Sequence, residues 1–266
     1  MDDRTRKLLS EIDKACRKFA DPALAAKYAR YFAEGYDAYG VKYDDPAWVK
    51  QKEAWLEAHR DLGLKGFLEL GQSLFATGKY EHGAVAIWFV SRFRDQLGAR
   101  AFAGIGKWFE GGVRNWAHSD VICGELLAPR LACGAVTLEA LKSWRGSPHK
   151  YKRRAAPVAM LGLLKVTADY RPLLEFLRPL MLDAEKVVHQ GLGWFLREAW
   201  KKQPAPVEAV LLEWKDSAPR LIFQYATEKM TAARKQRFRK AKRAGLKAPA
   251  QRARGPRARP SVPSMG

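Results

Sequence analysis

Residues 65–109 read KGFLELGQSLFATGKYEHGAVAIWFVSRFRDQLGARAFAGIGKWF. Apolar residues recur in this stretch at intervals of three and four, and turns that contain Gly or Asp interrupt it twice. We expect three helices here, over residues 65–76, 81–95 and 99–109. Because runs that alternate with a period of two are scarce, the stretch indicates an all-α chain without a sheet.

The same apolar spacing continues on both sides of this stretch. Further helices are predicted over residues 4–19, 22–33, 46–58, 115–128, 138–144, 150–166, 171–180, 184–201, 207–213 and 219–230. Helix pairs therefore recur about every 35 to 45 residues, the period of HEAT-like or armadillo-like repeats. Stacked pairs form a solenoid whose concave face, lined by the second helix of each pair, can hold duplex DNA. An irregular helical bundle is the alternative that periodicity alone leaves open.

The composition favours a nucleic-acid partner. The 266 residues include 48 Lys and Arg against 28 Asp and Glu, which gives a net charge of +20 and a long-range attraction to polyanions. No run of about 18 uncharged apolar residues indicates a membrane span, and no charged-then-apolar leader opens the chain. We therefore expect a cytoplasmic protein that has no membrane partner.

The cysteines and histidines form no recognisable metal-binding pattern. Cys16, Cys123 and Cys133 lack C-x-x-C spacing, and the five histidines show no H-E-x-x-H motif. We expect free thiols that serve as packing residues in a reducing compartment, with no metal and no cofactor.

Residues 231–266 differ in composition from the rest of the chain. They contain no acidic residue, and they supply twelve of the net positive charges, which leaves +8 for residues 1–230. A segment rich in Pro, Ala and Arg buries too little apolar surface to fold alone. We expect a folded domain over residues 1–230 and a disordered, DNA-binding tail over 231–266, in which residues 232–244 become helical against phosphates. A merely solubilising terminus is the alternative.

Two short segments place an acid, an aromatic residue and several cations on predicted helices. In RNWAHSD, residues 114–120, Trp116 and Asp120 stand four apart and share one helical face. Positive charge and free backbone N–H groups at the start of the helix predicted from residue 150 suit a phosphate. The cations there are Lys150, Lys152, Arg153 and Arg154.

A third segment, GLGWFLRE at residues 191–198, contains a second tryptophan. Gly193 lets a partner approach the helix closely, and Trp194 lies near Arg197 on the helix. Each candidate also has an ordinary explanation, because tryptophans often fill gaps between helices and charged residues often form a solvated face. Spacing alone does not decide between the two.

Taken together, these segments resemble the AlkD family of HEAT-like DNA glycosylases across residues 22–230. Residues 29–41, ARYFAEGYDAYGV, are similar to that family's opening helix and following turn. NWAHSD resembles its tryptophan and aspartate four residues apart, and RAA at Arg154–Ala156 resembles its arginine-led helix. GWFLRE at Gly193–Glu198 is similar to its second tryptophan motif. The order and the intervening distances also agree.

The resemblance implies a monofunctional DNA glycosylase that removes cationic alkylated purines, 7-methylguanine and 3-methyladenine, from duplex DNA. It implies a monomer without an obligatory protein partner. Asp120 would be the catalytic carboxylate, and Trp116 and Trp194 the walls of the cleft. Tyr31 would contact the lesion side, and Arg154 a phosphate. The neighbouring cations Lys152, Arg153 and Arg197 are further candidates for DNA contacts.

The sequence departs from the family pattern beside the aspartate. Asn115 and Ala117 stand where the family usually has a second aromatic and a second acidic residue, and Ser119 replaces an apolar residue. These departures predict a more polar cleft. A non-catalytic binder of damaged or branched DNA is the alternative function, and a protein-binding scaffold would need an apolar groove or one that suits an acidic partner.

Overall fold

The structure, a computed structural model, describes residues 3–241, among which there is no β-strand. The α-helices are α1 (Asp3–Lys18), α2 (Pro22–Ala29), α3 (Pro46–Ala58), α4 (Gly63–Ala76), α5 (Tyr80–Ser91), α6 (Ala99–Gly111), α7 (Trp116–Ile122), α8 (Ala128–Ala132), α9 (Lys142–Arg145), α10 (Lys150–Ala159), α11 (Arg171–Leu177), α12 (Lys186–Trp200), α13 (Pro204–Trp214), α14 (Arg220–Ala226) and α15 (Ala232–Gln236). Short 3-10 segments are η1 (Arg60–Leu62), η2 (Arg94–Gln96), η4 (Leu138–Leu141), η5 (Met160–Lys165) and η6 (Arg178–Leu182), and η3 (Cys123–Leu127) is a π-helical turn.

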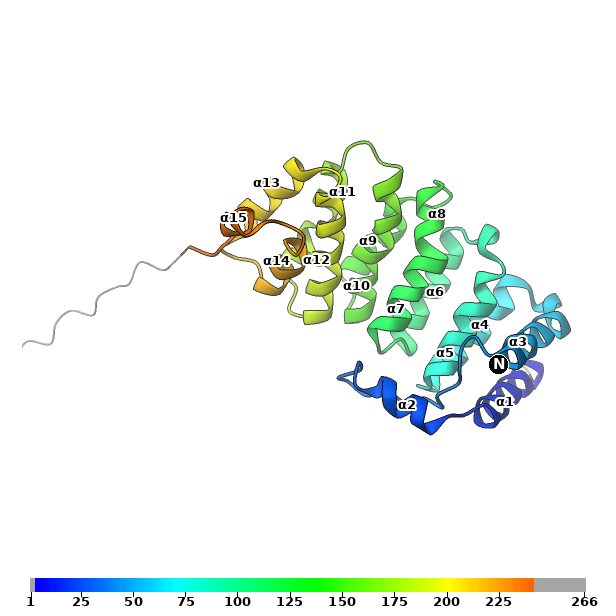
Figure 1. The fold of residues 1–266 in the computed structure, drawn as a ribbon. Coiled ribbons are helices and arrows are strands. Elements are labelled where there is room, and N and C mark those ends of the chain that lie inside the picture. Colours follow the sequence, from blue (N-terminus) through cyan, green and yellow to red (C-terminus); the bar gives the residue numbers. More distant parts are fainter. Residues whose placement is uncertain (1–2, 242–266) are drawn as a thin grey trace, which may run out of the picture.

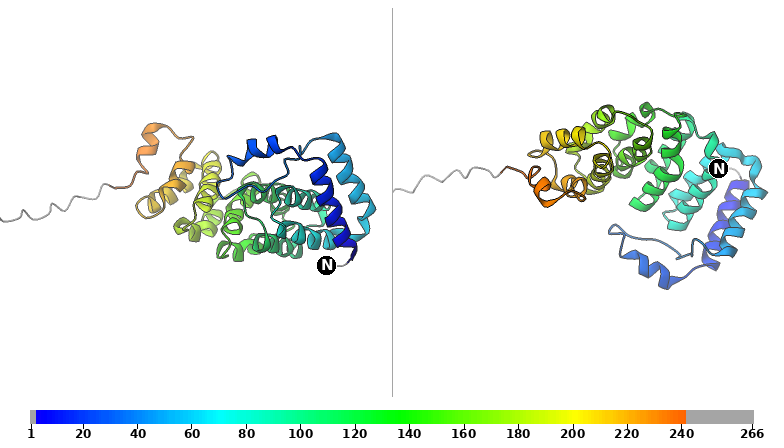
Figure 2. Two further views of the ribbon diagram at one scale, coloured as in Figure 1. Left: turned by 90° about the horizontal axis from the view of Figure 1, so that it is seen from below. Right: turned by 45° about the horizontal axis from the view of Figure 1, so that its top comes forward.

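The helices stack in pairs along a curved array (Figure 1). The second helices of successive pairs, α5, α7, α10, α12 and α14, form one row in which each contacts the next. In the other row, α4 packs against α6, and α11 packs against α13. At the N-terminal end the chain curves round, so that α2 lies apart from the stack (Figure 2). It lies across from the ends of the helices in the row that contains α5, α7 and α10. The predicted all-α helical-repeat solenoid is therefore confirmed.

The stretch that predicted the fold contributes completely buried residues to the hydrophobic core. Phe67, Leu70 and Leu74 on α4 are completely buried, as is Trp108 on α6. Farther along the stack, a Cβ atom on Gly193 would lie only 2.5 Å from the Cβ atom of Tyr225. The sequence predicts that a partner approaches closely at Gly193, and in the structure that partner is α14 of the same chain.

Two predicted helices end early or tighten for identifiable reasons. The helix predicted over residues 22–33 ends at Ala29, because Phe32 leaves the helix to stack against Trp116 and tertiary packing outweighs local propensity. The helix predicted over residues 150–166 continues as a 3-10 segment from Met160. Pro157 lies inside it and lacks the N–H that an α-helical bond needs.

The chain remains packed beyond the domain boundary predicted at residue 230. Within residues 231–241, Phe238 is completely buried, and Arg234 forms an ion pair with Glu208 at 2.6 Å. The folded region therefore extends past the predicted boundary, because an aromatic ring and an acidic partner stabilise the start of the basic segment. The rest of the predicted tail lies outside the described residues.

The cysteines follow the prediction in part. The three cysteines are free, and Cys16 and Cys123 are buried packing residues as predicted, whereas Cys133 is exposed.

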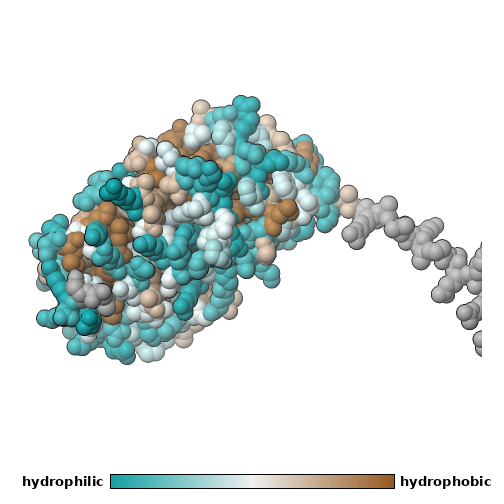
Figure 3. Space-filling view, turned by 180° about the vertical axis from the view of Figure 1, so that it is seen from behind, coloured by the Kyte–Doolittle hydropathy of each residue, from teal (hydrophilic) through white to brown (hydrophobic). Residues whose placement is uncertain are grey.

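On the face opposite to the Figure 1 view, hydrophilic residues prevail and hydrophobic residues gather in small separate patches (Figure 3). Over residues 3–241, the helices are too short or too polar to cross a membrane.

Candidate active site

A cavity of about 500 Å³ opens on the row of second helices. Side chains from α7, α10, α12 and α14 line it, together with the segment that follows α2. The lining residues are Tyr31, Phe32, Ala33, Glu34, Gly35, Arg114, Asn115, Trp116, Asp120, Tyr151, Arg154, Lys186, Val187, Gln190 and Tyr225. Four consecutive helices of the row thus contribute to a single concave site.

Asp120 and Arg154 form a two-point ion pair in this cavity. Nε and Nη2 of Arg154 donate to Oδ1 and Oδ2 of Asp120, each at 2.8 Å. Nη1 of the same guanidinium donates to the Val187 carbonyl oxygen at 2.7 Å. The Asp120 side chain is only 17% exposed, and the Arg154 side chain is 7% exposed. Because both carboxylate oxygens are held by a planar fork, the carboxylate has one fixed orientation.

Trp116 is held by its neighbours with part of its ring exposed. The residue is 41% exposed, and its indole Nε1 donates to the Tyr31 carbonyl oxygen at 3.1 Å. Phe32 stacks against it with a centroid distance of 5.7 Å and an interplanar angle of 15°. The segment after α2 therefore fixes the plane of the indole and leaves the remaining surface to the cavity.

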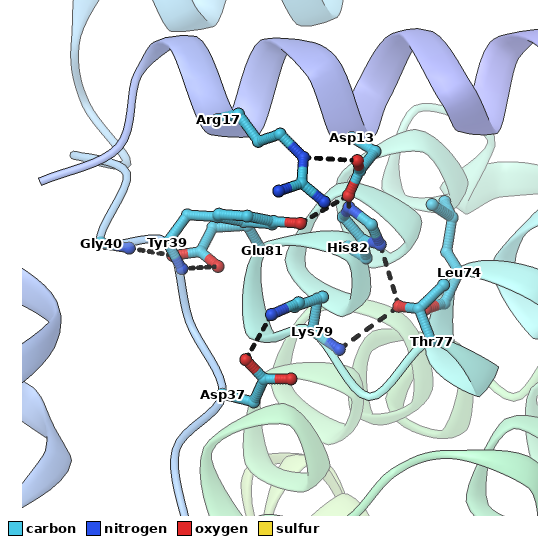
Figure 4. Close-up of polar contacts among 10 residues, drawn as sticks. All are labelled: Asp13, Arg17, Asp37, Tyr39, Gly40, Leu74, Thr77, Lys79, Glu81 and His82. Carbon is cyan, nitrogen blue, oxygen red and sulfur yellow. Dashed lines mark hydrogen bonds and ion pairs between the residues drawn. The ribbon is translucent and has the colours of Figure 1, made fainter. Parts of the chain in front are cut away.

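The same segment is anchored to α5 at its far end (Figure 4). The buried Glu81 carboxylate accepts hydrogen bonds from the backbone N–H groups of residues 39–41 at 2.9, 2.8 and 3.2 Å. Lys79 forms an ion pair with Asp37 beside it. By accepting hydrogen bonds from three backbone N–H groups, Glu81 holds in place a segment that has no regular secondary structure.

At the cavity, Glu34 links this segment to α10. Its Oε1 accepts from Lys150 Nζ at 2.6 Å, and its Oε2 accepts from the Tyr151 hydroxyl at 3.2 Å. Burial, followed by the charge of Glu34, raises the pKa of Tyr151, so the hydroxyl stays protonated and donates.

His118 is a buried residue of α7 that connects this helix to the start of α5. Its Nε2 contacts the Tyr80 carbonyl oxygen at 2.9 Å, and its Nδ1 contacts the Asn115 amide at 3.0 Å. Asn115 in turn caps α7 by accepting from the His118 backbone N–H. Burial lowers the pKa of His118 to about 4, so the ring is neutral and donates from Nε2.

Acid is therefore expected to destabilise the protein through His118. An unfolded histidine binds a proton near its ordinary pKa of 6.5, so protons favour the unfolded state as the pH falls from 6.5 toward 4. The free energy of unfolding should drop by about 2 kcal/mol between about pH 7.5 and pH 5 from this group. Urea unfolding at both pH values measures it. In His118→Gln, whose amide can still donate to Tyr80, that part of the drop should vanish. Equal pH dependence in the variant and the wild type would contradict this assignment.

The structure brings four of the predicted site residues together, namely Tyr31, Trp116, Asp120 and Arg154, which all line the cavity. Trp194 is not among the lining residues. It is partly buried and packs against the hydrophobic core, while other residues of α12, among them Gln190, line the cavity.

The other predicted DNA-contacting cations form ion pairs within the fold. These pairs are Lys152 with Glu110, Arg153 with Asp183, and Arg197 with Glu198 and Glu228. Lys152 is also buried. A phosphate would have to compete with a carboxylate for each of them, and their contacts with DNA stay predictions.

Sequence reasoning missed two cations at the rim of the cavity. Arg114 and Lys186 are exposed and line the cavity, and neither forms an ion pair within residues 3–241. The only local signal was their position, since Arg114 stands two residues before Trp116 and Lys186 opens α12. Glu34 and Tyr225 were also missed, and no spacing in the sequence indicates that they line one cavity.

Comparison with known proteins relates the chain to one family. Residues 12–230 match the family model described as "DNA alkylation repair enzyme". The chain matches no curated protein in sequence. Among solved structures, a "Predicted DNA alkylation repair enzyme from Enterococcus faecalis" is similar with a TM-score of 0.62 and 17% sequence identity, over 80% of this chain and 97% of that chain. At this identity, the structural likeness concerns the fold.

Proposed function

Because the chain belongs to the DNA alkylation repair enzyme family, we propose that it is a monofunctional DNA glycosylase. Its substrates are cationic alkylated purines, such as 7-methylguanine and 3-methyladenine, in duplex DNA, and it acts as a monomer at the bacterial nucleoid. The observation that carries the proposal is the oriented Asp120 carboxylate in a cavity shared with exposed Trp116. An anion and an aromatic face in one open cavity suit a reaction with a cationic transition state.

The chemistry needs few groups. Alkylation at a ring nitrogen makes the purine positively charged, so the base leaves as a neutral molecule when the bond to C1′ breaks. No general acid is required, and one carboxylate replaces the pair that ordinary glycosidases use. Asp120 stabilises the oxocarbenium-like sugar and orients the water that adds to C1′. Arg154 holds the carboxylate in position, and the Trp116 face contributes about 0.5 to 2 kcal/mol toward a cationic centre.

The rim cations are the better candidates for phosphate contacts. Arg114 follows the C-terminus of α6, whereas Lys186 opens α12, so they approach the cavity from different elements. Neither has to leave a carboxylate before it binds a phosphate, unlike Lys152, Arg153 and Arg197. We therefore assign the positioning of the DNA backbone to this pair.

Arg114→Ala and Lys186→Ala should each weaken binding to undamaged duplex DNA severalfold at low salt, and each should reduce the salt slope by about one. Fluorescence anisotropy across a range of salt concentrations measures both effects. Matched controls are Arg100→Ala, at the far end of α6, and Lys165→Ala, at the far end of η5, since both side chains are exposed and neither lines the cavity. Equal losses in controls and rim variants would mean that binding reflects net charge alone.

A non-catalytic binder of damaged DNA is the second candidate. The observation that favours it is the Asp120–Arg154 pair, in which a cation occupies both carboxylate oxygens. Release of free base from methylated duplex DNA, measured with the bound fraction in parallel, separates the two candidates. A protein that binds the lesion duplex tightly and releases no base is a binder.

A further inference from the structure

We propose that Glu34 is a second carboxylate of the site, released from Lys150 when a DNA phosphate binds there, and that its charge selects cationic lesions. This inference deepens the proposed function and rests on it. Glu34 is then a specificity-determining residue that works beside Asp120.

The charges that line the cavity show why a second carboxylate matters. The acidic lining residues are Glu34 and Asp120, against the cations Arg114, Arg154 and Lys186. Both oxygens of the Asp120 carboxylate are paired with Arg154, so the positive charge of Arg154 offsets much of its attraction for a cation that is not in direct contact. With Glu34 also paired to a lysine, the cavity presents no free negative charge to a cationic purine. Like charges at the rim would even oppose its entry.

The Glu34–Lys150 pair is placed where a phosphate can break it. The two side chains are 48% and 30% exposed, and such exposed pairs contribute little to stability. Lys150 also lines an adjoining depression of about 380 Å³ together with Arg114, His149 and Glu34 itself. Two cations and the Glu34 carboxylate therefore line one depression beside the cavity. A phosphate bound there by Lys150 and Arg114 replaces Glu34 as the charge-assisted partner of Lys150, and the release of counterions from the DNA favours this exchange.

Once Lys150 turns to a phosphate, the neutral Tyr151 hydroxyl is the remaining hydrogen-bond partner of Glu34 among residues 3–241. The cavity then gains one negative charge while Glu34 stays in place. It stays because its segment is anchored by the Trp116–Tyr31 hydrogen bond on one side and by Glu81 on the other. Seating of the DNA backbone and attraction of a cationic lesion are thereby coupled through a single exchange of ion-pair partners.

The test compares two duplexes that cannot react. One carries 7-methylguanine on a 2′-fluoro sugar, which resists breakage of the bond to C1′ and keeps the positive charge on the base, and the other carries unmethylated guanine on the same sugar. Wild-type protein should prefer the cationic duplex. Glu34→Gln should reduce the ratio of the two affinities on the order of tenfold, as expected for one charge lost within a few ångströms in a cleft that water reaches. An unchanged ratio would overturn the proposal.

Two further variants separate a charge effect from a structural one. Asp37→Asn breaks another ion pair of the same segment, with a lysine that is also 30% exposed, but Asp37 does not line the cavity; it should keep the wild-type ratio. Lys150→Ala should bind both duplexes more weakly and keep the preference for the cationic one. If Glu34 served only as a tether, Lys150→Ala and Glu34→Gln would act alike and neither would change the ratio.

Both readouts are binding constants, so this test does not depend on turnover. Base release with an unchanged affinity ratio in Glu34→Gln would overturn the role of Glu34 and leave the glycosylase intact. A wild-type preference that Glu34→Gln abolishes, without release of any base, would uphold the role of Glu34 and refute the glycosylase.

Discussion

Replacing Asp120 with asparagine is expected to lower the single-turnover rate of 7-methylguanine release by at least about a hundredfold, or about 2.7 kcal/mol. The substitution keeps the shape of the side chain and removes the anion that matches the developing charge on the sugar. Duplex binding should change little, because the carboxylate makes no contact that a phosphate would use. The measurement is base release from a duplex with one lesion, at protein concentrations that saturate binding.

The matched control for this variant is a substitution in the neighbouring ion pair, between Arg153 and Asp183. Asp183 accepts two hydrogen bonds from Arg153, as Asp120 does from Arg154, and it does not line the cavity. Asp183→Asn therefore disturbs a similar ion pair and should retain base release. An Asp120→Asn protein that is as fast as the wild type would refute the glycosylase proposal.

The fold could be predicted because its cause is local and repeated. Apolar residues at three- and four-residue intervals in residues 65–109 become the buried faces of α4, α5 and α6, and the repeat length determines how the pairs stack. The end of α2 could not be predicted in this way. Phe32 leaves the helical path for a ring on α7, and nothing near it in the sequence indicates that contact.

The candidate site was predictable in part for the same reason. Trp116 and Asp120 lie on one turn of one helix, so their spacing was informative. The partners of the α10 cations were not predictable. Lys152, Arg153 and Arg154 point in successive directions around the helix and meet acids from α6, from the turn after η6 and from α7. The position of these cations at the start of a helix indicated that they bind phosphates. In the folded chain, carboxylates from other segments form ion pairs with them instead.

Arg154→Ala is expected to destabilise the protein by about 3 kcal/mol, because it leaves a largely buried Asp120 carboxylate without its cation. Base release should fall as well, since the carboxylate loses its fixed orientation. Denaturant unfolding without DNA measures the first effect. Arg154→Lys keeps the charge but not the two-point geometry, so it should recover only part of both losses.

A double variant distinguishes this positioning role from the phosphate contact that the family resemblance implies for Arg154. In Arg154→Ala with Asp120→Asn, the neutral amide no longer needs a cation, so the double variant should be more stable than the sum of the single losses predicts. If Arg154 instead contacted a phosphate, Arg154→Ala would leave the DNA-free protein as stable as the wild type and would lower only the affinity for duplex DNA. Unfolding curves and binding curves of the same four proteins therefore decide which partner Arg154 serves.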